Sequence, residues 1–404
     1  MVTIPNLMIG MKHMNSQTDA LLTVFDDYHT AVYFSDPHHQ VELIGLGQTS
    51  TLHHFTLTEL TAWHAHQSVP VFGGLPFDHQ LQPTSDLMNG IMIAPAYVID
   101  LVSGKEWGTR PAPDHKQSPQ TQSIHVLSHT TETDWQARLQ PVLHTLQTDP
   151  QKQKVVLGMQ EHFDLDGQLA ASQLIKTLIR QQTQTYHVAI KHGDELFVSA
   201  TPERLVKLNQ NQIETAAVAG SIARGQSDEA DQKLAHELQQ DAKNQREHQL
   251  VVTEIERRLQ PWAQLDSVAV PEILTTPQIQ HLYTPITGTI KQTASVWQIV
   301  QALHPTPALG GLPVDWALAT IANVESHPRG LFAAPVGYVM PDGSGEFVIG
   351  IRSLWNKEHT VTLFAGAGIL AASDLAAEER EIQLKTTAME NILKEQLDDE
   401  RHDQ

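Results

Sequence analysis

The chain has 404 residues, of which 40% are hydrophobic and 18% charged, so it can bury a sizeable core. Its net charge of -20, from 26 Lys and Arg against 46 Asp and Glu, argues against nucleic acid or an anionic membrane as a partner. The absence of cysteine excludes disulfides, thiolate metal sites and cysteine nucleophiles. Because the sequence has neither a run of about 18 apolar residues nor a signal-peptide pattern, we expect a soluble, cytoplasmic protein.

The first part of the chain, residues 1–145, is rich in Gln, His and Thr. Its segments 45–47 (Gly-Leu-Gly) and 72–74 (Phe-Gly-Gly) are typical of turns between strands. Residues 103–125 contain Gly, Pro, Asp, Ser and Gln without periodicity, which predicts an exposed loop. In the second part, residues 146–397, short apolar runs at 155–157, 196–199 and 348–351 predict strands.

Two long helices are also predicted in residues 146–397. The first begins near Ser227, has an acidic first turn and ends at Pro261. The second begins after Ser373 or Asp374 as its N-cap and continues to about residue 397. Residues 398–404 are predicted to form a flexible tail.

Glu247 has an unusual position on the first predicted helix. Val251 and Ile255 continue from it at four-residue spacing, so the carboxylate lies on or beside the apolar face. An unpaired charge is unfavourable in that environment. Two interpretations follow: Glu247 forms an ion pair with a nearby Arg or Lys, or it is a metal ligand.

The second predicted helix places Glu378, Glu381 and Lys385 on one face, because they are spaced at i, i+3 and i+7. An ordinary Glu381–Lys385 pair on a solvated surface is one interpretation. The preceding segment, residues 365–369 (Ala-Gly-Ala-Gly-Ile), favours a ligand site. Its glycines permit close approach of the backbone to a ligand just before a helix N-terminus, where anions are stabilised.

Oxygen ligands from two helices, in a chain without thiolates, suit a hard cation such as Mg²⁺. This ion takes one or two carboxylates, keeps several waters and bridges to an anionic substrate, so an acidic protein can hold a dicarboxylate. Arg352, at a strand end, and Lys385 are candidates for direct contacts to carboxylates. A surface salt bridge is the alternative for Arg352.

Two further residues have side chains suited to proton transfer. Lys154 directly precedes the predicted strand 155–157, where a lysine either extends to solvent or is buried; a buried amine has a lowered pKa and can act as a general base. Glu203 follows a strand in a proline turn. It is a polar turn residue, a partner of Arg204, or a general acid, and composition and spacing do not choose between these roles.

Eight segments, taken in chain order, resemble those of the chorismate-binding enzymes, and most closely the isochorismate synthases. They are residues 201–205, 217–221, 243–252, 280–282, 303–311, 329–330, 345–347 and 365–369. The resemblance implies an α+β fold made of a single large chorismate-binding domain, with two β-sheets in the core and helices packed outside. Residues 1–145 would be a more divergent part of the same fold and residues 146–397 the catalytic region.

The resemblance also implies a reaction, the Mg²⁺-dependent conversion of chorismate to isochorismate, by addition of water at C2 and loss of the C4 hydroxyl. The water-using members resemble this chain in having a lysine at position 154, whereas anthranilate synthases usually have glutamine. Ala219 stands where aminodeoxychorismate synthases have a nucleophilic lysine, and alanine cannot attack C2. Without cysteine, no glutamine amidotransferase is fused to the chain, and no glutaminase subunit is expected.

The roles implied by the resemblance fall on specific positions. Lys154 would activate the water and Glu203 would protonate the departing hydroxyl. Glu247 and Glu381 would hold Mg²⁺ against the C1 carboxylate, with Glu378 adding a water-mediated contact. The residues that would line the chorismate pocket are Gly220, Ser221, Ala308, Arg352, Gly366 and Lys385.

Two departures from the family pattern and two alternative functions accompany this interpretation. Gly158 and Met159 stand where Ala or Ser and then Arg are usual, which removes a supporting arginine, and Glu379 replaces the usual tryptophan. One alternative is a salicylate synthase, which also eliminates pyruvate, and another is a non-catalytic chorismate-binding protein. Isochorismate serves both menaquinone and siderophore biosynthesis, and the sequence does not choose between them.

Overall fold

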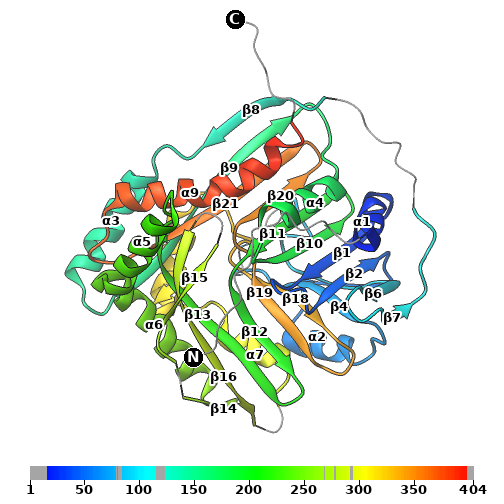
Figure 1. Cartoon of the computed structure of the whole chain (residues 1–404), viewed down its shortest axis with the longest axis horizontal. Coiled ribbons are helices and arrows are strands. Elements are labelled where there is room, and N and C mark those ends of the chain that lie inside the picture. Colours follow the sequence, from blue (N-terminus) through cyan, green and yellow to red (C-terminus); the bar gives the residue numbers. More distant parts are fainter. Residues whose placement is uncertain are drawn as a thin grey trace, which may run out of the picture.

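The computed structural model describes residues 16–78, 80, 84–114, 123–267, 269–276, 279–291 and 294–397. Within these residues, two large antiparallel sheets form the centre of the molecule and helices lie outside them (Figure 1). The α+β fold expected from the sequence is therefore confirmed. The predicted tail, residues 398–404, lies outside the described part of the chain.

The first sheet has eleven strands in the order β17-β9-β21-β20-β11-β10-β1-β2-β6-β7, with β8 pairing β9. These strands are β1 (Thr30–Ser35), β2 (Glu42–Leu46), β6 (Tyr97–Asp100), β7 (Glu106–Gly108), β8 (Val126–Thr131), β9 (Lys154–Leu165), β10 (Tyr186–His192), β11 (Glu195–Thr201), β17 (Gly311–Leu312), β20 (Ser353–Lys357) and β21 (Thr360–Ile369). The N-terminal strand β1 pairs β10, so the early part of the chain is built into the same sheet as the later part.

The second sheet has ten strands in the order β14-β16-β13-β12-β19-β18-β4-β5-β3, with β15 pairing β16. These strands are β3 (Ser50–His53), β4 (Val71–Gly74), β5 (Ile91–Ala94), β12 (Arg204–Asn209), β13 (Gln212–Ala223), β14 (Ala263–Leu265), β15 (Glu272–Thr275), β16 (Ile279–Ile290), β18 (Pro335–Val339) and β19 (Gly345–Ile349). Here β4 pairs β18, which again joins early and late segments.

The described helices cover the outer faces of the sheets. They are α1 (Ser16–Thr23), the short 3₁₀ helix η1 (Phe25–Asp27), α2 (Leu57–His64), α3 (Trp135–Thr148), α4 (Ala171–Gln181), α5 (Asp228–Gln240), α6 (Ala242–Leu259), α7 (Val296–Leu303), α8 (Val314–Val324) and α9 (Leu375–Lys394). Helix α6 packs on β13 and α9 packs on β21, so each of these helices covers a different sheet (Figure 1). No described helix is long and apolar enough to cross a membrane.

The prediction of one long helix after Ser227 was wrong, because the segment forms two helices. Ser227 caps α5, as predicted, by accepting a hydrogen bond from the backbone N–H of Ala230. Asp241 has extended backbone angles, ends α5 and caps α6, its Oδ1 lying 2.8 Å from the backbone nitrogen of Asn244. The start of the second long helix was predicted correctly, because Asp374 is the N-cap of α9. The helix ends at Lys394, before the predicted end near residue 397.

The two segments predicted as turns also differ from expectation. Residues 45–46 end β2 and residues 72–74 lie in β4; only Gly47, with φ +65°, is outside a strand. At Gly45 a Cβ atom would lie 2.6 Å from Pro95 Cγ, so the glycine allows a close approach within the strand. The predicted loop at 103–125 contains the short strand β7, and its residues 115–122 lie outside the described part.

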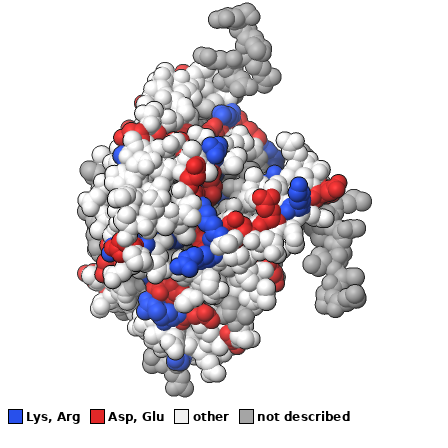
Figure 2. Space-filling view, turned by 90° about the vertical axis from the view of Figure 1, so that its left-hand side faces the viewer, with Lys and Arg blue, Asp and Glu red and all other residues white. Residues whose placement is uncertain are grey.

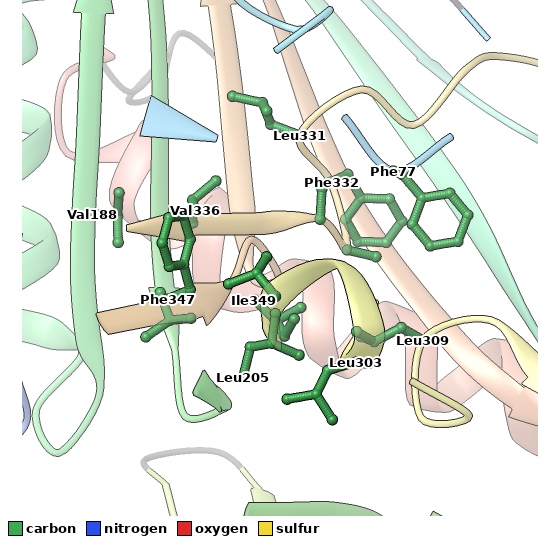
Figure 3. Packing of buried hydrophobic residues seen from close by; sticks show 14 of the residues in the cluster. Phe77, Val188, Leu205, Leu303, Leu309, Leu331, Phe332, Val336, Phe347 and Ile349 are labelled. Carbon is green, nitrogen blue, oxygen red and sulfur yellow. The ribbon is translucent and has the colours of Figure 1, made fainter. Parts of the chain in front are cut away.

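A single buried cluster joins the two sheets. Val188 of β10, in the first sheet, belongs to the same cluster as Val336 and Phe347 of β18 and β19, in the second (Figure 3). Phe332, next to Phe77 in the same view, belongs to this cluster and also lines a cavity. The apolar core therefore continues into the wall of the candidate site.

Candidate active site

A cavity of about 110 Å³ lies where the two sheets approach each other beneath α6 and α9. Strands β9 and β21 of the first sheet and β13 of the second contribute to its wall. All the residues predicted from the sequence to bind or react line this cavity: Lys154, Glu203, Gly220, Ser221, Glu247, Ala308, Arg352, Gly366, Glu381 and Lys385. The structure thus brings the predicted site together, while the role of each residue stays a prediction.

Lys154 is buried and lies against Glu247. It is the first residue of β9, is 1% exposed, and its Nζ is 2.8 Å from Glu247 Oε1. Burial alone would raise the pKa of Glu247, but the Lys154 ammonium, together with the charges of Lys243 and Lys385, outweighs burial and lowers the pKa. Of the two interpretations left open for Glu247, the ion pair is present. Lys154 does not extend to solvent.

Glycine at position 368 makes room for this pair. A Cβ atom added to Gly368 would lie 2.8 Å from Glu247 Oε1 and 2.9 Å from Lys154 Cε. Gly368 is on β21, directly beside β9, where it pairs with Val156. The structure shows a close approach of this glycine to Lys154 and Glu247, whereas the expected approach to a ligand stays a prediction.

Glu203 is buried in the cavity, and burial raises its pKa to about 7, although Lys154, Lys385 and Arg352 partly oppose the shift. It is not paired with Arg204. The next residue begins β12, where Arg204 Nε donates to Glu346 Oε1 at 2.7 Å. Glu203 is therefore a carboxyl group that changes protonation close to neutral pH, which is the property of a general acid.

The acidic face of α9 points into the same cavity. Glu381 and Lys385 form the i,i+4 pair at 2.7 Å, but both line the cavity instead of an open surface. Lys385 Nζ also donates to the backbone oxygen of Gly366 at 2.8 Å. Glu378, for which a water-mediated metal contact was expected, is buried and pairs with Lys243 of α6 at 2.6 Å. Lys243 had been given no role from the sequence.

Three of the four cavity carboxylates are paired with an ammonium group: Glu247 with Lys154, Glu378 with Lys243 and Glu381 with Lys385. Among the described residues no cluster of three or more His, Cys, Asp or Glu side chains is arranged to hold a metal ion by itself. The cavity balances four basic side chains, Lys154, Lys243, Arg352 and Lys385, against four acidic ones, Glu203, Glu247, Glu378 and Glu381. The molecular face shown in Figure 2 likewise has basic and acidic side chains next to one another.

Arg352 is buried, so the surface salt bridge considered for it is wrong. Its backbone has φ +47°, burial lowers its pKa to about 10 against the opposing charge of Glu203, and its Nη2 donates to His281 Nε2 at 2.8 Å. Its Nη1 is buried, and no residue in the described part of the chain is its hydrogen-bond partner. Sequence reasoning assigned no role to His281, although the segment 280–282 was one of the matching motifs.

The two departures from the family pattern have local explanations. The backbone N–H of Gly158 donates to Glu325 Oε1 at 2.6 Å, and Glu325 pairs with the buried Arg329. Arg329 also donates to the backbone oxygen of Val156 at 2.8 Å, so an arginine from another segment supports β9. On α9, Glu379 accepts a hydrogen bond from Gln136 of α3 and lies away from the cavity.

Comparison with known proteins agrees with this site. The family model described as chorismate binding enzyme matches residues 97–394. The chain belongs to this family. The resemblance inferred from eight short segments is thereby confirmed. Individual relatives indicate which members of the family are similar to this chain.

The chain is 35% identical over 282 residues to isochorismate synthase MenF from Bacillus subtilis (strain 168), covering 70% of this chain and 59% of the relative. It is 37% identical over 241 residues to the salicylate biosynthesis isochorismate synthase of Pseudomonas aeruginosa, covering 59% and 50%. The matched region thus spans between half and two thirds of each relative's length. The solved structure of MenF from Escherichia coli, called menaquinone-specific, superimposes with a TM-score of 0.80 and 25% identity, covering 92% of this chain and 91% of that one.

Proposed function

We propose that this chorismate-binding enzyme is an isochorismate synthase, an isomerase that adds water to C2 of chorismate and releases the C4 hydroxyl. The observation that carries the proposal is the buried Lys154 beside a cavity that also holds Glu203. Ala219 lines the same cavity, so a lysine nucleophile of the aminodeoxychorismate synthase type is missing from that position. The names of the relatives support the same reaction.

Lys154 and Glu203 divide the proton transfers between them. Lys154 acts as a base only as the neutral amine, so its ammonium form, which pairs with Glu247, first releases a proton to solvent. A water molecule then attacks C2 while Lys154 takes one of its protons, leaving a hydroxyl on C2. Glu203, with a pKa of about 7, gives its proton to the C4 hydroxyl, which leaves as water. One water enters and one leaves, so chorismate and its product are isomers. A base and an acid in one cavity are what this exchange requires.

Chorismate is a dicarboxylate, and basic cavity residues suit it. Arg352 presents a buried Nη1 for which none of the described residues is a hydrogen-bond partner, and a substrate carboxylate is the group that best satisfies it. Lys385 supplies a second positive charge. The other proposed contacts come from Ser221, Ala308 and the backbone of Gly220 and Gly366, which line the same wall.

Mg²⁺ is proposed as the cofactor because the oxygen donors of the cavity fit a hard cation. Glu247 and Glu381 would hold the ion, and Glu378 would contact it through water. Two protein carboxylates suffice when substrate and water complete the shell, although no described cluster of three groups is arranged as a metal site. The bound ion would neutralise the substrate carboxylate. To bind the ion, Glu247 and Glu381 would have to release Lys154 and Lys385, with which they are paired in this structure.

Product analysis tests the proposal. The pure protein is incubated with chorismate and Mg²⁺, with and without ammonium, and products are separated by chromatography. We expect isochorismate in both samples, without any glutaminase subunit. Anthranilate or aminodeoxychorismate as the main product with ammonium would overturn it. Fluorescent salicylate would identify a salicylate synthase, and no turnover would favour a non-catalytic binding protein.

A further inference from the structure

Three side chains, Ser221, His281 and Arg352, form a continuous hydrogen-bonded chain in the cavity wall. His281 lies on β16 directly opposite Ser221 of β13, next to a bulge at Gly220, which has φ +78°. Ser221 Oγ is 2.9 Å from His281 Nδ1, and Arg352 Nη2 is 2.8 Å from His281 Nε2. All three residues line the cavity.

The direction of each hydrogen bond in this chain is fixed by chemistry. A guanidinium has only donors, so Nε2 of His281 must accept from Arg352 and cannot carry a proton. The single proton of the neutral ring is therefore on Nδ1. Nδ1 then donates to Ser221 Oγ.

The surroundings keep the ring neutral. Burial lowers the pKa of His281 well below its ordinary value, and the positive charges of Arg352 and Lys385 lower it further. A second proton on the ring would have no acceptor and would face the Arg352 guanidinium. The neutral form with its proton on Nδ1 is therefore the form that the packing accommodates.

Two donors are left for a ligand by this arrangement. Because Ser221 Oγ accepts from the ring, its own O–H is free to point elsewhere. Arg352 uses Nη2 on the ring, and its buried Nη1 has no hydrogen-bond partner among the residues that the structure describes. Both donors belong to side chains that line one cavity, on either side of His281. A carboxylate, with two acceptor oxygens, matches two such donors.

We propose that His281 is a positioning residue: its ring, held between Ser221 and Arg352, orients both as a two-donor clamp for one carboxylate of the bound chorismate. The inference rests on the proposed function only for the identity of the ligand. It gives His281 no part in proton transfer. His281 acts through its two neighbours, so its loss should affect binding of the substrate more than the chemical step.

The test measures chorismate affinity in a double-mutant cycle. The dissociation constant is determined by calorimetry with EDTA present, and KM and kcat are determined from the loss of chorismate with Mg²⁺, whichever product forms. The variants are His281→Leu, Arg352→Ala and the pair together. Since each removes one side of a buried, charge-assisted contact, we expect each single variant to weaken binding by roughly 10–100-fold. His281→Leu should then have little further effect when Arg352 is already alanine.

Two conservative variants separate positioning from mere packing. His281→Gln can present an amide oxygen near the position of Nε2 and should recover part of the affinity lost in His281→Leu. Ser221→Ala should weaken binding less than Arg352→Ala, because it removes a neutral donor.

If the effects of His281→Leu and Arg352→Ala on the dissociation constant multiply, or if leucine and glutamine at position 281 give the same affinity, the proposed clamp is wrong. If His281→Leu does not fold, a cycle with His281→Gln and Ser221→Ala decides the same question. A product other than isochorismate would overturn the proposed function but leave these affinities interpretable.

Discussion

Lys154 Nζ and Glu247 Oε1 are in contact at 2.8 Å, and the absence of a side chain at Gly368 leaves the space in which they meet. We therefore predict that Gly368→Ala displaces one partner and lowers turnover by roughly 10²-fold, because small displacements of reacting groups have effects of that size. Steady-state kinetics and thermal unfolding check this. The control is Gly104→Ala, in an exposed turn where an added Cβ meets no atom within 4 Å but φ is +73°; it should lower the unfolding temperature and keep full activity. Full activity in Gly368→Ala would contradict the account of the pair.

Lys154→Ala should lower kcat by roughly 10²–10⁴-fold, the range for loss of a general base. The partly exposed Lys152, whose Nζ lies 5.8 Å from the centre of the Trp316 ring, provides a matched control. Lys152→Ala should retain wild-type turnover. Equal kcat values for the two variants would show that Lys154 is not the base.

Activity should decrease as the pH rises through about 7, because Glu203 acts only in its protonated form and burial raises its pKa to about 7. The quantity to follow is kcat/KM, which reports the free enzyme. In Glu203→Gln this alkaline decline should vanish, and the remaining rate should be roughly 10²–10⁴-fold lower. Glu214→Gln, at the exposed partner of Arg204, should keep the wild-type profile. An unchanged profile in Glu203→Gln would assign the decline to another group.

Removal of the metal should abolish activity, and excess Mg²⁺ should restore it after EDTA treatment. Glu247→Ala and Glu381→Ala should each raise the Mg²⁺ concentration needed for half-maximal rate, or eliminate turnover, because each removes a proposed ligand. Glu379→Ala is the matched control, since this neighbouring carboxylate contacts Gln136 instead of the cavity. If EDTA does not change the activity, Glu247 and Glu381 are not metal ligands and only form ion pairs with lysines.

The site could be predicted from the sequence more fully than the local structure. Glu247 was found because a carboxylate on an apolar helix stripe is conspicuous, and α9 was placed because Asp374 is a favourable N-cap. The break at Asp241 was missed because helical periodicity resumes immediately after it. The glycines of β2 and β4 were taken for turn residues because close packing of strands also selects glycine.

The positioning role of His281 could not be read from the sequence, since it depends on a cross-strand pair. The bulge at Gly220 brings Ser221 opposite His281, and Arg352 arrives from a distant segment with a left-handed backbone. Neither relationship can be recognised from the spacing of residues along the sequence. The pairing of Lys154 with Glu247 was hidden for the same reason, although each residue had been selected by its own context.

In the proposed reaction, water from solvent is added at C2 and the original C4 hydroxyl leaves. Its most direct test is brief turnover of chorismate in H₂¹⁸O with Mg²⁺, followed by mass spectrometry of the product at low conversion. The account predicts isochorismate carrying a single heavy oxygen, located on C2, and this product should be strongly reduced with Lys154→Ala. Isochorismate without the label, which would mean that the original hydroxyl migrates within the substrate, would contradict the account.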